Sequence, residues 1–596
     1  MSSLILNRRD LEFVLYEWLQ VEQFCMFPRY SDHSRETFDA VLDLCEQMAN
    51  EHFASHNKKN DAQEPWFDGE QVHIIPEVKQ ALDVFAEAGL IAAGQDYELG
   101  GMQLPTVVEK ACFAWFLAAN VATAAYPFLT IANANLLLHW GTKQQIDTWV
   151  KPMLAGRFFG TMCLSEPQAG SSLADIRTRA EPQADGSYRL FGNKMWISGG
   201  EHSLSENIVH LVLARLPDAP PGVKGISLFL VPKLLLDEHG NPAERNDVVL
   251  AGLNHKMGYR GTVNTLLNFG EGKFTPDGKA GAVGWLVGEP NKGLACMFHM
   301  MNEARIGVGL GAVALGYTGY LHALDYARER RQGRALANKD PHSQPVALIE
   351  HADVRRMLLA QKAYVEGGLA LNLYCAKLVD EQRDALDEEL DDISLLLDVL
   401  TPIAKSWPSQ WCLEANNLAI QVHGGYGYTR DYNVEQFYRD NRLNPIHEGT
   451  HGIQALDLLG RKVVMQEGAG LDILVQKIQQ TTAEAAPDPE LAGYAAELDA
   501  AVYQICDVTQ QLHAAGHPEL TLANASVYLE AMGHIVLAWI WLQQMQVAKG
   551  RQEDFYRGKM QAGQYFFNWE LPKAAPWMAL LADLDTTCLL MQDSWF

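Results

Sequence analysis

Metal-binding patterns are missing from this sequence of 596 residues. Its nine cysteines include no CxxC pair, and its 19 histidines include no HExxH motif and no paired spacing. Structural and catalytic zinc sites normally carry such spacings, so we expect no metal ion. An odd number of scattered thiols is typical of core cysteines in a reducing compartment, which predicts a cytoplasmic protein.

Basic residues are scarce relative to acidic ones. The chain has 47 lysines and arginines against 73 aspartates and glutamates, which gives a formal charge of −26 at pH 7. A nucleic-acid partner requires a basic face, so this balance argues against DNA or RNA binding. It does not exclude an anionic ligand, because a local group of arginines can outweigh the field of distant charges.

Long hydrophobic runs and internal repeats are also missing. The apolar segments at residues 307–321 and 535–542 are too rich in glycine or too short to span a bilayer. Residues 1–9 contain no apolar segment of the kind found in secretory signal peptides. We therefore expect a protein that is neither secreted nor bound to a membrane. No tract of low complexity and no repeat with a period of about 20–50 residues is present.

The patterns that are present divide the chain into four parts. A chain of this length is too long for one hydrophobic core, so several domains are expected. Apolar residues recur with the helical period before residue 159 and again after residue 290. We predict a helical domain, a β domain, a helical bundle and an additional C-terminal helical domain, at residues 1–158, 159–290, 291–464 and 465–596.

The fold class predicted from these parts is α+β. Within the first part we expect helices at residues 76–89, 106–119 and 122–139, and a polar loop at residues 56–61. In the second part, short β-rich runs separated by Gly and Pro predict a small antiparallel barrel or sandwich. These runs lie at residues 159–164, 188–197, 208–215, 225–231, 263–269 and 285–287.

Four short motifs stand out in this framework. They read MCLSEPQAGS at residues 162–171, KMWISGG at 194–200, QVHGGYGY at 421–428 and NPIHEGTHG at 444–452. Taken singly, each has an ordinary structural interpretation as a turn, a core tryptophan or a surface glutamate. In this order and spacing they resemble the acyl-CoA dehydrogenase family of flavoproteins, and the resemblance extends from about Gly89 to Val464.

The resemblance implies an FAD-dependent enzyme in which Glu448 is the catalytic base. Such an enzyme converts an acyl-CoA thioester to the trans-2-enoyl-CoA: the base takes the α-proton, and the β-hydrogen leaves as hydride to flavin N5. The reaction needs one positioned carboxylate and hydrogen-bond donors at the thioester oxygen. Burial beside an apolar acyl chain should raise the pKa of Glu448 towards the working pH.

The resemblance also implies which residues contact the ligands. Hydroxyls, backbone N–H groups and glycines allow close approach to a flavin, an indole packs on its ring, and an arginine pairs with its pyrophosphate. The implied cofactor contacts are Met162, Leu164, Ser165, Gly170, Ser171, Trp196, Ser198, Arg330, Gln421, Gly424, Gly425 and Thr450. The implied substrate contacts are Ser171, Asn302, Arg305 and Gly449.

Several positions depart from the family pattern. Gln168 and Ser172 stand where the family often has Gly and Asp, and Asn302 stands where it has Asp. Gly452 replaces a frequent Gln, and residues 332–334 read Gln-Gly-Arg instead of Gln-Phe-Gly. The last change leaves open which of Arg330, Arg331 and Arg334 meets the pyrophosphate.

The length of the chain resembles a bacterial long form of the family. That subgroup includes 3-methylmercaptopropionyl-CoA dehydrogenases and broad-range fatty acyl-CoA dehydrogenases. The resemblance implies a homodimer, with electron-transfer flavoprotein as the electron acceptor. Two alternatives stay open: an acyl-CoA oxidase that passes electrons to oxygen, and a flavin-bearing DNA-binding relative. Peroxide yield and a salt-dependent DNA-binding assay would distinguish them.

Overall fold

The computed structural model describes residues 3–337 and 340–596. The chain forms two compact units, each assembled from separate segments. The first, called here the helical unit, comprises the residues up to Phe38, Pro105–Ala118 and Arg305–Phe596. The second, called here the sheet unit, comprises Asp39–Leu104 and Ala119–Ala304. Each unit is described by itself.

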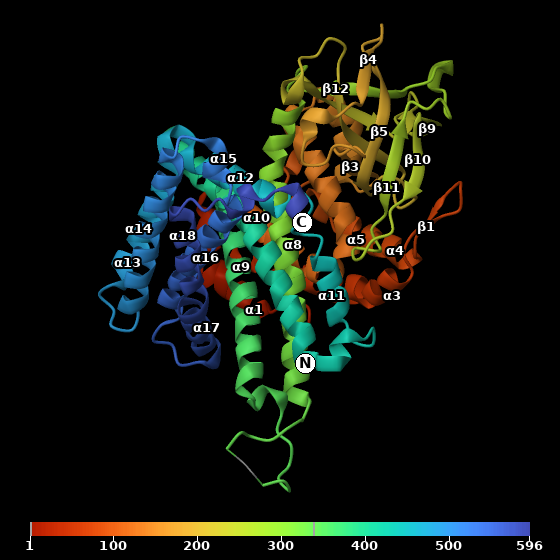
Figure 1. The fold of residues 1–596 in the computed structure, drawn as a ribbon. Helices are drawn as coiled ribbons and strands as arrows, with labels where there is room; N and C mark the ends of the chain where they lie inside the picture. Colours follow the sequence, from red (N-terminus) through yellow and green to blue (C-terminus); the bar gives the residue numbers. More distant parts are fainter. Residues whose placement is uncertain (1–2, 338–339) are drawn as a thin grey trace. The chain divides into compact units, whose positions relative to one another are not determined.

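The sheet unit is built on an eight-stranded sheet, drawn in orange to yellow-green in Figure 1. The strand order is β10-β11-β5-β12-β7-β6-β3, with β4 pairing β5 and β6. Most neighbours are antiparallel, but β3 and β4 run parallel to β6. The strands are β3 (Phe158–Cys163), β4 (Arg179–Pro182), β5 (Tyr188–Ser198), β6 (Asn207–Arg215), β7 (Ile226–Pro232), β10 (Val248–Leu253), β11 (Asn264–Phe269) and β12 (Ala282–Val287).

The predicted strands lie in this sheet, and two further strands were not predicted. Runs of branched and aromatic residues give β6 and β7 almost complete burial, and these strands supply much of the core. The strands missed are β4 and β10, because β4 is short and polar and the register of β10 shifts between Leu250 and Gly252. Two small hairpins, β1–β2 (Trp66–Phe67, Val72–His73) and β8–β9 (Leu234–Leu236, Pro242–Arg245), lie outside the main sheet.

The helices of the first 157 residues follow the predicted periodicity with one exception. Helix α4 (Pro76–Glu87) begins at its proline and is followed by Gly89 in the left-handed conformation, at φ 72°. Residues 56–61, predicted as a polar loop, instead contribute to helix α3 (Asn57–Ala62). Two of the polar side chains there, His56 and Asn60, are buried, and His56 Nε2 lies 2.9 Å from Thr123 Oγ1. Tertiary contacts therefore override the local composition.

Two predicted helices join into one long helix. Helix α5 (Thr106–Trp140) is continuous except at Asn120, whose backbone is non-helical, at φ −162° and ψ 86°. The break falls between the two predicted segments. The other helices in this region are α1 (Arg8–Glu12), α2 (Arg35–Met48), α6 (Lys143–Gln145) and α7 (Lys151–Leu154).

The helical unit is a bundle of long helices with an added layer of shorter ones (Figure 1). The bundle comprises α8 (Gly293–Glu329), α9 (Ala352–Asp384), α10 (Asp387–His423), α11 (Val434–Asn441) and α12 (His451–Gly460). The added helices, blue in Figure 1, are α13 (Ala469–Ala485), α14 (Ala492–Ala514), α15 (Pro518–Leu522), α16 (Ala525–Ala548), α17 (Asp554–Tyr565), α18 (Ala574–Ala582) and α19 (Thr587–Leu590). We call residues 465–596 the C-terminal extension. Its helices α13 and α16 pack on α10 and α9.

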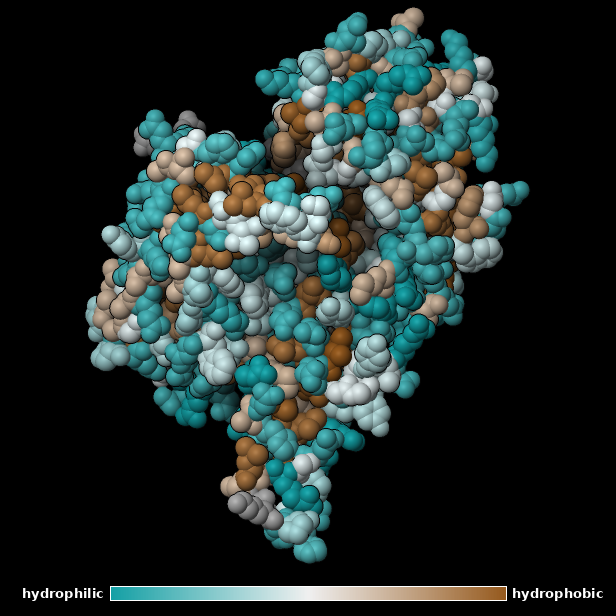
Figure 2. Space-filling model, viewed as in Figure 1, coloured by the Kyte–Doolittle hydropathy of each residue, from teal (hydrophilic) through white to brown (hydrophobic). Residues whose placement is uncertain are grey.

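Within residues 3–337 and 340–596, two helices are long and apolar enough to cross a membrane, namely α5 and α16. In both, 83% of the most apolar window is buried inside the structure, which is the usual situation of a core helix. Helix α16 buries Trp539 and Trp541 among its neighbours. Hydrophilic residues predominate on the face of the molecule shown in Figure 2.

Candidate active site

In the sheet unit, the loop after β3 is fixed by a buried ion pair. Lys194 Nζ lies 3.0 Å from Glu166 Oε1, and both side chains are almost completely buried. The same ammonium donates to the Leu164 carbonyl at 2.9 Å, and Met195 N donates to the Ser165 carbonyl at 3.0 Å. The predicted residues Leu164 and Ser165 are therefore held against β5 through their backbones.

Further hydrogen bonds keep Glu166 ionised. Its oxygens accept from Thr178 Oγ1 at 2.6 Å, Arg177 N at 2.7 Å and Gln168 Nε2 at 2.7 Å. Burial acts to raise the pKa of Glu166, but Lys194 and these donors outweigh it, so the pKa falls to about 2. Gln168, a departure from the family pattern, thus contributes a bond to this anchor.

Trp196 has a strained backbone and an exposed side chain. Its φ is 66°, in the left-handed region that a bulky residue rarely occupies, and 60% of its surface is exposed. Two residues on, Ser198 Oγ accepts a hydrogen bond from Asn264 Nδ2 at 3.1 Å. The cost of holding an indole in this way, about 1–3 kcal/mol, points to a ligand that covers the ring.

The end of the loop after β3 is open. Gly170 and Ser171 are exposed, while Met162 is half-buried on β3. A β-carbon placed on Gly170 would meet nothing within 4 Å, and the residue does not have a positive φ. Neither packing inside the chain nor backbone conformation requires glycine there. The open space fits a group that comes from outside the chain.

In the helical unit, Glu448 lies in the turn that joins α11 to α12. Its φ is 53°, and Gly449 follows at φ 85°. A β-carbon on Gly449 would lie 2.5 Å from Gln454 Nε2, so glycine is required both by conformation and by space. Gln454 Nε2 in turn donates to the carbonyls of Glu448 at 3.1 Å and Gly449 at 3.4 Å. The turn is thus held on one side by α12.

A buried lysine holds the turn on the other side. Lys405 of α10 is fully buried, and its Nζ donates to the carbonyls of Asn444 at 2.7 Å and Gly449 at 2.8 Å. Burial lowers the pKa of Lys405 to about 7, although the charge of Glu448 acts to raise it. For Glu448 burial is also the main influence and raises the pKa, while Lys405 and Arg305 act to lower it.

A chain of buried amides connects the turn to the bundle. Asn416 Nδ2 donates to the Leu315 carbonyl at 2.9 Å, and Asn441 Nδ2 donates to Asn416 Oδ1 at 2.7 Å. Asn444 Nδ2 then donates to Asn441 Oδ1 at 2.8 Å, and His447 Nε2 lies 3.0 Å from Asn444 Oδ1. Because a buried network with all its hydrogen bonds made specifies one geometry, this series of hydrogen bonds fixes the position of His447, the residue before Glu448.

Five other predicted residues of the helical unit lie either at α12 or at the end of α10. Thr450 is the N-cap of α12, where its hydroxyl accepts from Ile453 N at 3.3 Å. Arg305 is buried on α8 and pairs with Asp457 of α12 at 2.8 Å. Gln421, Gly424 and Gly425 are exposed at the end of α10, and neither glycine would meet an atom within 4 Å of an added β-carbon.

The three candidate arginines differ in their surroundings. Arg331 donates to the Pro345 carbonyl at 3.3 Å, and Arg334 donates to the Ser343 carbonyl at 3.0 Å and to the Pro341 carbonyl at 2.7 Å. Arg330 has its guanidinium carbon 5.7 Å from the ring centroid of Tyr426, in the exposed glycine turn. Asn302, the last predicted substrate contact, is half-buried on the part of α8 that belongs to the sheet unit.

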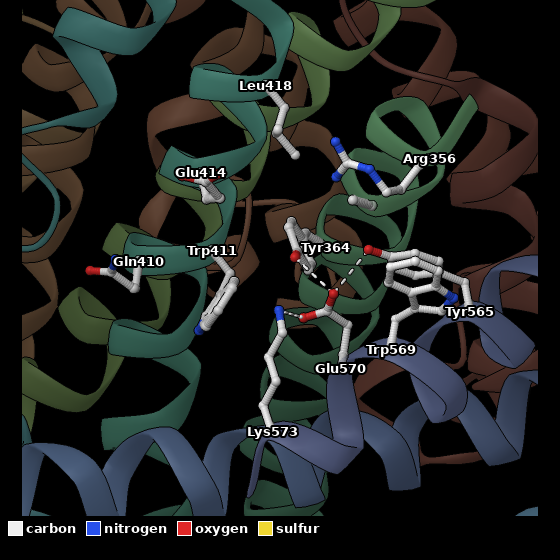
Figure 3. A pocket seen from close by; sticks show the side chains of 11 residues that line it. Arg356, Tyr364, Gln410, Trp411, Glu414, Leu418, Tyr565, Trp569, Glu570 and Lys573 are labelled. Atoms are coloured by element: carbon white, nitrogen blue, oxygen red, sulfur yellow. Dashed lines mark hydrogen bonds and ion pairs between the residues drawn. The ribbon is translucent and has the colours of Figure 1, made fainter. Parts of the chain in front are cut away.

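A cavity of about 340 Å³ lies elsewhere in the helical unit (Figure 3). It is lined by residues of α9, α10 and the C-terminal extension, and by none of the predicted site residues. Glu570 is at its centre and accepts from Tyr364 OH and Tyr565 OH at 3.0 Å each and from Lys573 Nζ at 2.6 Å. The carboxylate is satisfied by the chain's own groups, so we assign no ligand to this cavity.

The residues that support the site are not predicted by the sequence motifs. Lys405 and the buried asparagines act through contacts between distant helices, which no local motif reveals. Glu166 and Lys194 lie inside two of the motifs, and their opposite charges could have predicted an ion pair between these motifs. Among the residues that the structure describes, no group of three or more His, Cys, Asp or Glu could hold a metal ion.

Four family models match the chain along its length. They are the acyl-CoA dehydrogenase N-terminal domain at residues 35–157, middle domain at 161–270 and C-terminal domain at 291–463, followed by "Acetyl-CoA dehydrogenase C-terminal like" at 474–592. The 3-methylmercaptopropionyl-CoA dehydrogenase of Ruegeria pomeroyi is 36% identical over 94% of each chain. The broad-specificity linear acyl-CoA dehydrogenase FadE5 of Mycobacterium tuberculosis is 34% identical over the whole of both chains.

Solved structures and a more distant relative agree with these matches. An acyl-CoA dehydrogenase of Bacillus anthracis complexed with FAD has a TM-score of 0.73 at 19% identity, covering 94% of this chain and 90% of that one. ACDH-11 of Caenorhabditis elegans in complex with C11-CoA also has a TM-score of 0.73, at 18% identity over 94% and 89%. Subunit CarC of the caffeyl-CoA reductase–Etf complex of Acetobacterium woodii is 28% identical over 64% of this chain and 89% of that one.

The chain belongs to the acyl-CoA dehydrogenase family. The predicted family, the predicted fold class and the assignment as an oxidoreductase of this class are therefore confirmed. The extra helices after the bundle have a family model of their own, in agreement with the long form expected from the sequence.

Proposed function

We propose that this protein dehydrogenates an acyl-CoA thioester between its α- and β-carbons and yields the trans-2-enoyl-CoA. Family membership supports the reaction class, and the state of Glu448 supports the assignment of the base. A carboxylate held in a strained turn, with its pKa raised by burial, is suited to accept a proton near neutral pH. This observation carries the proposal.

FAD is the cofactor that this family membership supports, and several features of the chain fit it. The glycines at 170 and 425 face open space, and Trp196 presents an exposed indole, so a large planar ligand has both room and a ring to contact. In the sheet unit, Met162, Leu164, Ser165, Ser171, Trp196 and Ser198 are the residues proposed to hold it, and in the helical unit Thr450 is. FAD, when bound, accepts the hydrogen that leaves the β-carbon as hydride.

The chain's own chemical step is the transfer of the α-proton to a Glu448 carboxylate oxygen. The Cα–H bond breaks, its electron pair forms the new carbon–carbon double bond, and Glu448 becomes a neutral acid. Burial raises the pKa of Glu448, and the charges of Lys405 and Arg305 act against that rise and favour the carboxylate form. Gly449 lets the backbone approach the thioester, and Ser171 and Asn302 are the proposed contacts with the CoA chain.

We also propose that Arg330 meets the cofactor pyrophosphate of a neighbouring subunit. Arg331 and Arg334 already donate to carbonyls of their own loop, whereas Arg330 lies over Tyr426 in the exposed glycine turn. Gln421, Gly424 and Gly425 would serve the same ligand. A homodimer is the assembly proposed, because the exposed turn of one subunit could then contact the cofactor of the other. The proposed location is the cytoplasm.

The substrate class is proposed from the two full-length relatives. One is named for a thioether acyl-CoA and the other for linear acyl-CoA thioesters, so both classes belong in the test panel. Electron-transfer flavoprotein is the proposed electron acceptor, because a relative is named as part of an Etf complex. Reduction of that flavoprotein without peroxide formation would distinguish the dehydrogenase from an oxidase.

The decisive experiment is anaerobic stopped-flow reduction of the bound flavin in Glu448→Gln. Glutamine keeps the size of the side chain but removes the proton acceptor. We expect FAD content and acyl-CoA binding to be retained, and flavin reduction to slow by roughly 10²–10⁴-fold. Reduction within a few-fold of the wild-type rate would show that Glu448 is not the base.

A further inference from the structure

The C-terminal extension contacts the helix that follows the catalytic base. Glu530 of α16 lies with its Oε1 3.2 Å from Nε2 of His451, the first residue of α12. Its second oxygen, Oε2, accepts a hydrogen bond from Trp411 Nε1 of α10 at 2.7 Å. One carboxylate of the extension therefore contacts both α12 and α10.

We propose that Glu530 and His451 are positioning residues for the base, so that the extension takes part in proton abstraction by holding Glu448 in place. This inference rests on the proposed function of Glu448. It assigns a role to the extension beyond packing, because the contact reaches a helix whose first turn is continuous with the catalytic turn.

The backbone connects His451 directly to Glu448. His451 N donates to the Pro445 carbonyl at 2.9 Å, which closes the segment that contains Glu448. Gln454, one turn further along α12, donates to the carbonyls of Glu448 and Gly449. A displacement of the first turn of α12 would therefore move the backbone of the base. Glu448 has a left-handed backbone, which persists only where neighbours hold it.

A second contact from the extension lies at the other end of α12. His513 Nε2 of α14 is 3.1 Å from the Leu459 carbonyl. A β-carbon on Gly460 would lie 3.2 Å from Leu522 Cδ2, so α15 packs closely at the same end. Because both ends are held, α12 cannot tilt freely about either one. The helix is fixed between α10 and the extension.

The chemistry of the Glu530–His451 pair suits positioning better than simple packing. Both side chains are largely buried, with 18% and 20% of their surfaces exposed. Burial acts to raise the pKa of Glu530, but its contacts with His451 outweigh this and the pKa is lowered. A buried polar contact of this kind adds little net stability compared with apolar packing, yet it fixes direction as well as distance.

The test uses the full-length holoenzyme and compares Glu530→Leu, His451→Leu and the double variant. The probe is butyryl-CoA or 3-methylmercaptopropionyl-CoA, whichever reduces the wild-type flavin faster. Displacing a reacting group by about 1 Å can cost up to about 10²-fold in rate, so we expect each single variant to slow flavin reduction by about 10-fold. The double variant should be no slower than either single one, because all three lose the same contact.

The control variant is Thr509→Val, which removes a buried hydrogen bond to Tyr528; the side-chain hydrogen bonds of Thr509 run to Ile505 and Tyr528, both inside the extension. Its thermal midpoint should fall while its reduction rate stays at the wild-type value. FAD content and the Kd for the acyl-CoA should be unchanged in Glu530→Leu, so that the loss appears in the reduction rate and not in binding. His451→Lys, which places a hydrogen-bond donor and a cation opposite Glu530, should keep part of the rate that His451→Leu loses.

Two outcomes would overturn different claims. If Glu530→Leu loses stability like Thr509→Val but reduces its flavin at the wild-type rate, the positioning role is wrong while the base assignment stands. If Glu448→Gln itself reduces flavin at a rate near that of the wild type, the assignment of Glu448 as the base is wrong, and the proposed function is contradicted. The two failures are distinguishable because they occur in different variants.

Discussion

Glu448 owes both its conformation and its ionisation to residues that are far away in the sequence. Lys405 bonds the turn from within the bundle and opposes the rise in pKa that burial causes. A base must be ionised to act, and at working pH its ionised fraction depends on this lysine. The proposed base, at 448, and the lysine that lowers its pKa, at 405, therefore lie 43 positions apart.

Replacing Lys405 tests this tuning. In Lys405→Met the cation that lowers the pKa of Glu448 is lost, so that pKa should rise further. The base is active as the carboxylate, so the rate of flavin reduction should reach half its maximum at a higher pH than in the wild type. Stopped-flow reduction across a range of pH measures the shift.

The matched control for Lys405→Met is Lys462→Met. Lys462 is also buried and paired, with its Nζ 2.5 Å from Asp398 Oδ1. The charges that shift the pKa of Glu448 are those of Lys405 and Arg305, and not that of Lys462. The control should lose stability without moving the pH profile. An unchanged profile in Lys405→Met would contradict the electrostatic role of this lysine.

At the scale of elements, the first two glycines of the turn Gly424–Tyr428 are exposed and have room that the chain itself does not use. A β-carbon on Gly425 would meet nothing within 4 Å, and its φ is not positive. Gly493, near the start of α14, has the same two properties and is a matched control.

We expect Gly425→Ala to keep its free energy of unfolding within about 0.5 kcal/mol, since the site is exposed and open. Its FAD content after gel filtration should fall, because the added methyl group occupies the space proposed for the cofactor. Gly493→Ala should keep both its stability and its FAD. Full FAD occupancy in Gly425→Ala would show that the turn does not contact the cofactor.

The elements and the site differ in how much of them the sequence predicts. The predicted gap between residues 119 and 122 is realised at Asn120, because a periodic pattern reveals helices and their ends. The loop predicted at residues 56–61 is helical, since His56 gains a buried partner that local composition does not show. In the site, motifs identify Glu448 and Trp196, but the chain of Asn416, Asn441 and Asn444 depends on the packing of separate helices.

At the scale of the whole molecule, the predicted assembly can be tested by sedimentation. If Arg330 and the glycine turn complete a neighbouring subunit's site, FAD should sediment only with a dimer or a larger species. Analytical ultracentrifugation that monitors flavin absorbance measures this directly. A fully active monomer that carries FAD would contradict the proposed assembly, and Arg330→Ala should weaken FAD retention without changing the fold.

The contact between Glu530 and His451 also has a consequence for synthesis. The base is at position 448 and its outer support is at 530, so 82 residues separate them in the order of translation. At about 5–20 residues per second, a ribosome needs several seconds to add that stretch. During this interval the nascent chain contains the proposed base without the contact between Glu530 and His451. A product terminated before α16 would lack this support, so we expect it to reduce its flavin no faster than Glu530→Leu does.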